Sequence, residues 1–179
     1  MSALTAGTDQ WDISTHDGFI AYYDATLRDA YRAAARLTGG NQASAEDVVH
    51  DAYLSLMRAA RRSDVTEVSV GWIVTAVRNR FIDGVRSSDR EERRLQLVAT
   101  TDTVDAEESS QRSPTATTAT NATALLAALS DRERAAMVLR YVDDRPVAEV
   151  AELMGTSVRA TESLLQRAKR KARSARGAE

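Results

Sequence analysis

Basic side chains gather near the C-terminal end of the sequence, in a stretch with helical spacing. Residues 157–176 hold seven Lys or Arg and one acid, Glu162, which gives a local charge of +6. Such cations bind nucleic-acid phosphates, although a solvated C-terminal helix shows the same excess because cations suit its dipole. The preceding residues favour the first interpretation, since Val147–Met154 is typical of a short helix, Gly155 of its end and Ser157 of a cap. This spacing predicts a helix-turn-helix, whose second helix enters the major groove of DNA.

A second group of charged side chains lies in the first half of the sequence, with acids before bases. Glu46, Asp47, His50 and Asp51 fall on the polar face of one expected helix. The arginines that follow are Arg58, Arg61, Arg62, Arg78, Arg80 and Arg86. An acidic surface suits a basic protein partner and a basic one suits nucleic acid, whereas two solvated helix faces give the same pattern. The residues alone leave both interpretations open.

Composition limits the classes of function that remain. The net charge of −2 over 179 residues sums acidic and basic blocks, so it does not exclude nucleic acid. The sequence has no cysteine, which excludes disulfides, thiolate zinc sites and a cysteine nucleophile. His16 and His50 are the only histidines, and neither lies in an acid–base or metal motif. We therefore expect no enzymatic activity, no cofactor and no metal.

Export and membrane insertion are not expected either. No apolar run approaches the ~18 residues of a membrane helix. Residues 1–11 contain no Lys or Arg and lack the apolar core of a signal peptide. Together with the absence of cysteine, which fits a reducing compartment, this predicts a cytoplasmic protein.

Apolar spacing and helix-stop signals predict an all-α fold of two small helical domains joined by a flexible acidic linker. The expected helices span 17–38, 44–62, 72–86, 130–142, 147–154 and 157–176, with a loop over 63–71. Residues 44–47 and 130–133 have the pattern of capping boxes. The expected buried face of the first helix carries Ile20, Tyr23, Leu27, Tyr31, Ala34 and Leu37, and Tyr141 is expected in the second core. The domains are a disordered tail (1–16), a first bundle (17–88), a linker (89–123) and a second bundle (124–176).

Three segments in this order resemble a known family. They are SAEDVVHDAY at 44–53, GWIVTAVRNRFID at 71–83 and LSDRE at 129–133, the last followed by the helix-turn-helix. The chain resembles a bacterial RNA polymerase sigma factor of the extracytoplasmic-function group, which keeps only sigma regions two and four. The order and spacing fit residues 18–88 for region two and 124–175 for region four.

The resemblance implies partners and sites. Core RNA polymerase would be bound through its β′ coiled coil and its β flap, and an anti-sigma protein is a further possible partner. The residues at the coiled-coil positions are Glu46, Asp47, His50 and Asp51. The loop 64–70 would offer a pocket for an unpaired base of the promoter's minus-ten element. The residues that would contact the minus-ten DNA are Arg61, Arg62, Arg78, Asn79, Arg80 and Arg86. The residues that would contact minus-35 promoter DNA are Arg159, Thr161, Glu162, Ser163, Arg167, Lys169 and Arg170.

The sequence departs from the family pattern at three of these positions or beside them. Glu162 stands where a basic residue is common, Leu164 where Arg is common, and His50 where Gln is common. A glutamate accepts a hydrogen bond from cytosine N4 or repels phosphate, so the promoter sequence does not transfer from the family.

Two other functions fit parts of the pattern. A stand-alone helix-turn-helix regulator would use the first domain for dimerisation or sensing and would bind a palindromic site without polymerase. A sigma-like decoy would bind an anti-sigma protein and no DNA, although the basic final helix argues against it.

Overall fold

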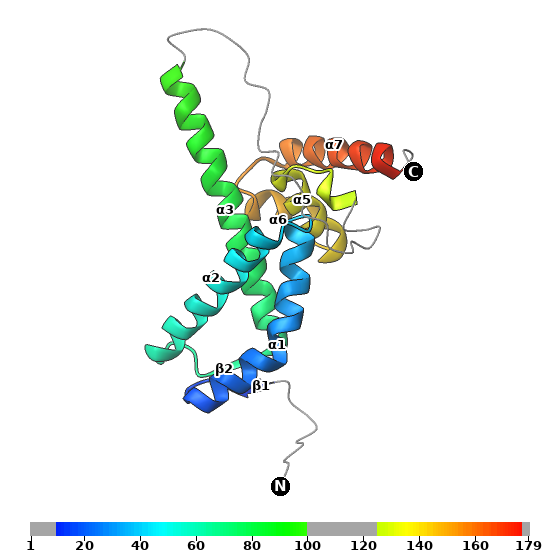
Figure 1. Cartoon of the computed structure of the whole chain (residues 1–179). Coiled ribbons are helices and arrows are strands. Elements are labelled where there is room, and N and C mark those ends of the chain that lie inside the picture. The colour runs from blue at the N-terminus through cyan, green and yellow to red at the C-terminus, as the bar shows by residue number, and fades with distance from the viewer. Residues whose placement is uncertain (1–9, 100–124, 177–179) are drawn as a thin grey trace.

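The computed structural model describes residues 10–99 and 125–176, and this part of the chain is almost entirely helical (Figure 1). The elements are β1 (Gln10–Asp12), α1 (His16–Leu37), α2 (Gln42–Arg61), β2 (Glu67–Ser69), α3 (Val70–Ala99), α5 (Asp131–Met137), η1 (Val138–Val142), α6 (Val147–Leu153) and α7 (Val158–Arg176). The prediction of an all-α fold is confirmed. Residues 1–9 of the predicted tail and 100–123 of the predicted linker lie outside the described residues.

Helices α1, α2 and α3 form an N-terminal bundle around one apolar core. Tyr22 from α1, Leu56 from α2 and Val77 from α3 are fully buried in it. The Thr26 hydroxyl donates to the Tyr22 carbonyl at 2.6 Å and lies 2.8 Å from the Tyr53 hydroxyl. The buried hydroxyls of Thr26 and Tyr53 therefore have partners, which avoids the cost of leaving them unpaired.

The face that α1 buries agrees with the predicted one only in part. The buried residues are Tyr22, Thr26, Ala30, Ala34 and Leu37, so the prediction is confirmed for Ala34 and Leu37. Tyr23 and Leu27 are partly buried against the core. Ile20 is 44% exposed and Tyr31 is 39% exposed, so the prediction is wrong for these two residues. The helix instead buries a neighbouring stripe with Thr26 and Ala30, since small residues let helices pack closely.

A two-stranded antiparallel ribbon stands where the sequence predicted irregular chain. Trp11 of β1 lies opposite Val68 of β2, and the Ile13 amide donates to the Thr66 carbonyl at 2.8 Å. Ile13 and Val68 are both buried. The predictions of a loose tail through residue 16 and of an irregular loop over 63–71 are therefore wrong for these residues. Three-residue strands are too short to show a period in the sequence.

The starts of α2 and α5 and the end of α3 can be compared with the helix boundaries that the sequence predicts. Helix α2 begins at Gln42 because the Asn41 side chain accepts from the Ser44 amide at 3.0 Å, so the capping box predicted at 44–47 is wrong. The capping box predicted at Ser130–Glu133 is confirmed at the start of α5. Helix α3 runs to Ala99, far past the predicted end at 86, and its last turns extend beyond the bundle (Figure 1).

The elements α5, η1, α6 and α7 form a smaller C-terminal bundle. Leu139, Val150 and Leu165 are buried at its centre. Tyr141, which was predicted to lie in this core, is instead 48% exposed. It lies on η1, a turn of π-helix, where the wider spacing moves side chains away from the positions that an α-helical period predicts.

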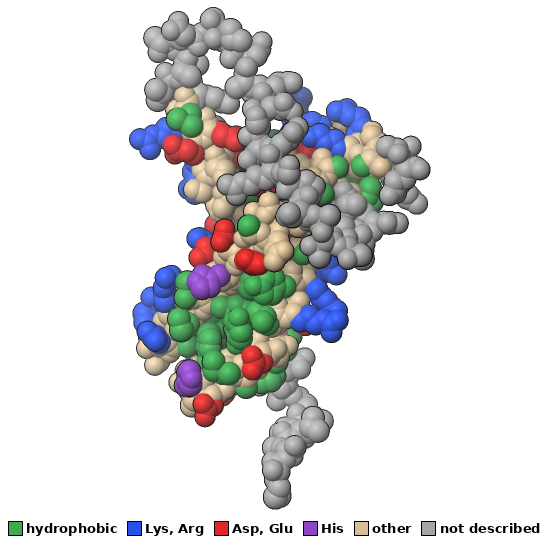
Figure 2. Space-filling model, viewed as in Figure 1, with side chains coloured by type: hydrophobic (Ala, Val, Ile, Leu, Met, Phe, Trp, Pro, Cys, Tyr) green, Lys and Arg blue, Asp and Glu red, His purple; other side chains and the backbone are tan. Residues whose placement is uncertain are grey.

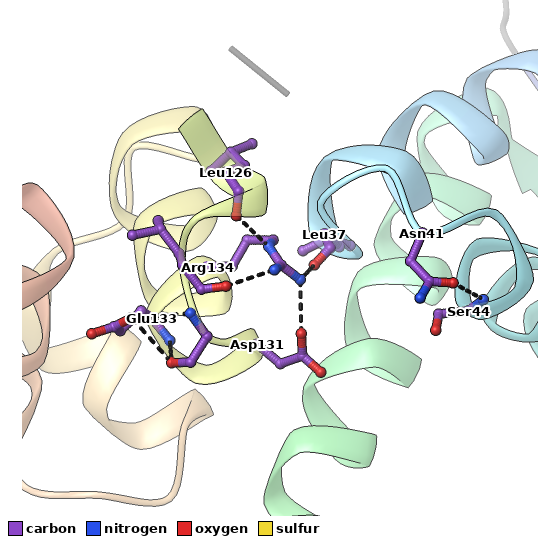
Figure 3. Close-up of polar contacts among 9 residues, drawn as sticks. Leu37, Asn41, Ser44, Leu126, Asp131, Glu133 and Arg134 are labelled. Atoms are coloured by element: carbon purple, nitrogen blue, oxygen red, sulfur yellow. Dashed lines mark hydrogen bonds and ion pairs between the residues drawn. The ribbon is translucent and has the colours of Figure 1, made fainter. Parts of the chain in front are cut away.

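The two bundles contact each other directly. The guanidinium of Arg134 on α5 reaches across to donate to the Leu37 carbonyl at the end of α1, at 3.0 Å (Figure 3). Two ion pairs also join the bundles, Arg78–Asp143 and Arg132–Asp89. The buried apolar residues of both halves accordingly form one continuous cluster.

Candidate nucleic-acid and protein-binding surfaces

The helix-turn-helix predicted for 147–176 is present as α6, a four-residue turn and α7. Gly155 has a φ of +62° in that turn, a conformation that favours glycine. The Ser157 hydroxyl accepts from the Ala160 amide at 3.2 Å, as expected of a helix cap. Leu164, Leu165 and Ala168 fix α7 against the bundle, so the opposite face of α7 points outward.

That outward face of α7 is basic and exposed. Six of the seven residues predicted to contact minus-35 DNA are exposed there: Arg159, Glu162, Ser163, Arg167, Lys169 and Arg170. Figure 1 shows α7 at the edge of the molecule, away from α2. A shallow depression on this face is lined by Gln166, Lys169, Arg170, Arg173 and Ser174. A convex helix with a row of guanidinium groups fits the shape and charge of a major groove.

Thr161 does not belong to this surface. Its side chain is fully buried, and its hydroxyl donates to the Ser157 carbonyl at 3.0 Å. The prediction that Thr161 contacts DNA is therefore not compatible with this geometry. Gln166, which the sequence analysis passed over, lies exposed on the outward face between Ser163 and Arg170. Its helical spacing from Ser163 was a sufficient signal, and glutamine pairs well with adenine.

A second exposed feature of the C-terminal bundle is Tyr141. The Lys169 ammonium lies 4.9 Å from the centre of its ring, and the Arg140 guanidinium lies 5.5 Å from it. These are cation–π distances. Tyr141 therefore holds the Lys169 side chain at one side of α7.

The acidic face predicted on α2 is present. Glu46, Asp47 and His50 are exposed, and the Asp51 side chain is about half-exposed. The Gln42 amide donates to the Glu46 carboxylate at 2.9 Å, which orients it near the start of the helix. Acids in this part of a helix are favoured by its dipole.

An apolar surface adjoins this acidic face. Figure 2 shows hydrophobic side chains gathered over the N-terminal bundle between two histidines. The large apolar side chains of Ile20 and Tyr31 on α1 are exposed. Burial raises the pKa of the Tyr31 hydroxyl, and the nearby Glu46 carboxylate raises that pKa further. The exposed Tyr31 of α1 and Glu46 of α2 therefore lie close together on the surface.

Two of the predicted sites meet at an ion pair. Arg80 of α3, predicted to contact DNA, donates through Nε and Nη2 to the Asp51 carboxylate at 2.8 and 2.7 Å. Both side chains are about half-exposed, and such a pair contributes little, roughly 0–1 kcal/mol. Either partner can therefore exchange it for contact with another molecule at small cost.

The remaining predicted minus-ten cations do not share one face. Arg61 and Arg62 are exposed at the end of α2, and Arg62 pairs with Asp64 at 2.7 Å. Asn79 is exposed on α3.

Arg78 and Arg86 lie against the C-terminal bundle. Arg78 is only 15% exposed, and its guanidinium contacts Asp143 of the C-terminal bundle at 2.5 Å. The Arg86 guanidinium lies against Gly155 in the turn of the helix-turn-helix. Trp72 is partly buried and packs against the core.

The described residues hold no group of three or more His, Cys, Asp or Glu side chains placed to bind a metal ion. Within the same residues, no helix is both long and apolar enough to cross a membrane.

Comparisons with known proteins match both bundles. The family model described as Sigma-70 region 2 matches residues 22–91, and the one described as Sigma-70, region 4 matches residues 120–171. Together the matches cover about two thirds of the 179 residues. No curated protein sequence matches the chain. Among solved structures, the chain is similar to a co-crystal structure of the sigma factor RpoE in complex with the anti-sigma factor NepR from Bartonella quintana. The identity is 21%, over 88% of this chain and 95% of the other, with a TM-score of 0.47.

Proposed function

The chain belongs to the sigma-70 family of transcription factors and has region two and region four, as in the extracytoplasmic-function group. On that premise we propose that its acidic surface binds core polymerase and its basic surfaces bind promoter DNA. The protein binds core RNA polymerase, directs it to promoters with two elements, and opens the DNA by binding energy. It is not an enzyme, and it works in the cytoplasm with the polymerase. Residues 17–88 act as region two, 89–123 as the linker and 124–176 as region four.

One observation carries this proposal: surfaces of opposite charge lie on the two parts that the two family models match. The outward face of α7 is a basic helix face of a helix-turn-helix, suited to duplex DNA. The face of α2 with Glu46, Asp47, His50 and Asp51 is acidic, suited to a basic protein. DNA binding alone does not account for the acidic face of α2.

The core-binding surface includes the apolar stripe of α1. Tyr31 lies beside Glu46, so a partner helix that meets the acids there also covers exposed apolar area. Burial of apolar surface supplies affinity at about 25 cal/mol per Å², while the charges supply register and association rate. The β′ coiled coil of the polymerase is the partner proposed here, and the β flap is the partner proposed for region four.

The test is transcription by purified components. Core polymerase, the full chain and a library of genomic fragments are combined, and run-off transcripts are sequenced. Transcripts that need both proteins and share two upstream elements support the proposal. Binding to a palindromic site without core indicates the stand-alone regulator instead, and binding to an anti-sigma protein without any DNA binding indicates the decoy.

Asp47→Arg tests the acidic surface within the same assay. We expect the affinity for core to fall by about 100-fold or more, because placing like charges across an interface costs several kcal/mol. Asp83→Arg is the matched control, since Asp83 is an exposed acid on α3 outside the proposed surface. Equal affinity of the Asp47 variant and wild type for core polymerase would exclude α2 as the docking helix.

A further inference from the structure

One strand of the β1–β2 ribbon belongs to the loop that is assigned to the unpaired minus-ten base. That loop spans residues 64–70, and β2 is its central part. Gln10 of β1 lies opposite Ser69 of β2, and the Ile13 amide donates to the Thr66 carbonyl at 2.8 Å. The middle of the loop is therefore paired with residues that precede the first helix.

The two ends of this loop are fixed without β1. At its start, the Asp64 amide donates to the Ala59 carbonyl of α2 at 3.1 Å. At its end, the Tyr22 hydroxyl of α1 donates to the Ser69 carbonyl at 3.1 Å. Burial raises the pKa of Tyr22 to about 12, so this hydroxyl keeps its proton. A chain held only at its ends samples many conformations, so the pairing with β1 restricts the residues between them.

The ribbon has an anchored face and a free face. Val68 is buried, and the Trp11 ring meets the Tyr22 ring edge-on, with 6.2 Å between their centres. Side chains alternate along a strand, and Glu67 and Ser69, on either side of Val68, are exposed. A two-stranded ribbon is marginally stable alone, so its shape depends on the anchored face. The free face remains open to a ligand.

A glycine at the start of α1 lets β1 approach that helix closely. A Cβ on Gly18 would collide with the carbonyl oxygen of Asp12, the last residue of β1. The Thr15 hydroxyl accepts from the Gly18 amide at 3.1 Å, which ties the same turn to the connection between β1 and α1. Glycine weakens a helix, so its presence here fits the close approach of β1.

We propose that β1 is a positioning element for the minus-ten site, and that Trp11 and Gly18 hold the loop in the shape that receives an unpaired base. This inference rests on the proposed function of the loop. Figure 1 shows the ribbon at the end of the N-terminal bundle that lies far from α7, and the docking acids lie in the first half of α2, whereas the loop follows its end. Displacement of β1 therefore lowers discrimination at one minus-ten base and leaves core binding and minus-35 binding unchanged.

Gly18→Ala tests whether the close approach holds β1 in place. Gly84→Ala is the matched control, because Gly84 is also in a helix and a Cβ there meets nothing within 4 Å. In the Gly18 variant we expect the Ile13 amide to exchange with deuterium about tenfold faster or more, measured by nuclear magnetic resonance, since its hydrogen bond to Thr66 then opens more often. The control should keep the wild-type rate. Equal rates in both variants would overturn the part of Gly18 in positioning.

Binding of single strands to the complex with core polymerase tests the site itself. The probe is a fluorescein-labelled 12-mer with the minus-ten sequence shared by the run-off transcripts, compared with 12-mers changed at one base. Gly18→Ala and Trp11→Ala should each reduce the strongest base discrimination by about tenfold, which is within the value of one base contact. Trp11→Phe keeps an aromatic edge against Tyr22 and should keep most of the discrimination. Affinities for core and for minus-35 duplex should stay within about twofold of wild type, because those surfaces are distant.

A disulfide between the strands separates positioning from a direct contact of Trp11 with the base. The chain has no cysteine, so Gln10→Cys and Ser69→Cys give one pair, at positions that lie opposite each other. Added to Trp11→Ala, this pair should restore base discrimination when oxidised and not when reduced. The reduced form of the same chain is the control for the two substitutions themselves.

Three results would overturn positioning by β1. They are equal discrimination in the oxidised and reduced forms, unchanged discrimination in Gly18→Ala despite faster exchange at Ile13, and loss of core or minus-35 binding to the same extent as minus-ten binding. Failure of the proposed function is seen separately, as absence of run-off transcripts with the wild-type chain, and it would remove this inference as well.

Discussion

Helices α3 and α7 are both rich in arginine, but the arginines predicted to contact DNA have different surroundings on the two helices. On α3, Arg78, Arg80 and Arg86 all lie within 4 Å of a carboxylate. On α7, no arginine in the described part of the chain has such a partner, and the one ion pair there belongs to Lys171. Local charge density is therefore a poor guide to availability for DNA, whereas the position of each side chain relative to the neighbouring bundle decides it.

Arg134 and Arg173 give the largest contrast between an engaged arginine and a free one. Arg134→Met leaves two buried carbonyls and one partly buried carbonyl without their donor, so the free energy of unfolding should fall by about 3 kcal/mol. Arg173→Met, on the exposed side of α7, should change it by less than about 0.5 kcal/mol. Urea denaturation of the full chain followed by far-UV circular dichroism measures both. Equal stability of the two variants would show that Arg134 is not held as described.

Gln166 tests whether the outward face of α7 reads bases as well as phosphates. Gln166→Ala should weaken discrimination at one base pair by about 1–3 kcal/mol, because a bidentate amide contact to adenine is lost. Selection of bound duplexes from a random pool, done with both proteins, shows which position relaxes. Ser174→Ala, further along the same face, is the control and should select the wild-type sequence. Identical selected sequences for the Gln166 variant and wild type would exclude Gln166 from base readout.

Arg170 and Lys171 are neighbours in sequence with different surroundings. They therefore allow a paired and an unpaired basic side chain to be compared within α7. The Lys171 ammonium donates to Glu133 at 2.9 Å, and Arg170 is exposed. Burial tends to raise the pKa of Glu133, but the hydrogen bonds from Lys171 and Ser130 outweigh it and hold that pKa below its usual value. Arg170→Ala should reduce the slope of log K against log salt for duplex binding by about 0.9, which is one phosphate contact. Lys171→Ala should reduce it by less, and the reverse order would contradict the assigned orientation of α7.

The sequence was sufficient for elements with a strong local signal. The helix-turn-helix, the capping box at Ser130 and the acidic face of α2 all follow from spacing and cap chemistry within a few residues. The β1–β2 ribbon was missed because its two strands are three residues each and 57 positions of chain separate Gln10 from Glu67. Tyr141 was misplaced because a π-turn changes the period on which the prediction relied.

Contacts between the bundles are the part that spacing does not predict. Asp143 follows η1 and lies between the expected helices 130–142 and 147–154, in a connection where an acid is normally solvated. The structure buries it against Arg78, 65 positions earlier in the chain. Nothing in the local sequence distinguishes this aspartate from its exposed neighbour Asp144. Because local sequence does not predict this ion pair, Arg78 was assigned to DNA without a competing role.

Asp143 also gives the smallest expected effect, a dependence of stability on pH. Burial raises the pKa of the Asp143 carboxyl from its ordinary 3.8, and the Arg78 and Arg145 guanidinium groups lower it only in part. The folded state therefore binds the Asp143 proton more tightly than the unfolded chain. This contribution to stability is fully present below the ordinary pKa and is lost as pH rises through the raised value. Asp143→Asn cannot titrate, so the difference in the free energy of unfolding between wild type and this variant, measured by urea denaturation, should change modestly in favour of wild type as pH falls towards 4. A difference that does not change with pH would assign the effect to other carboxyl groups.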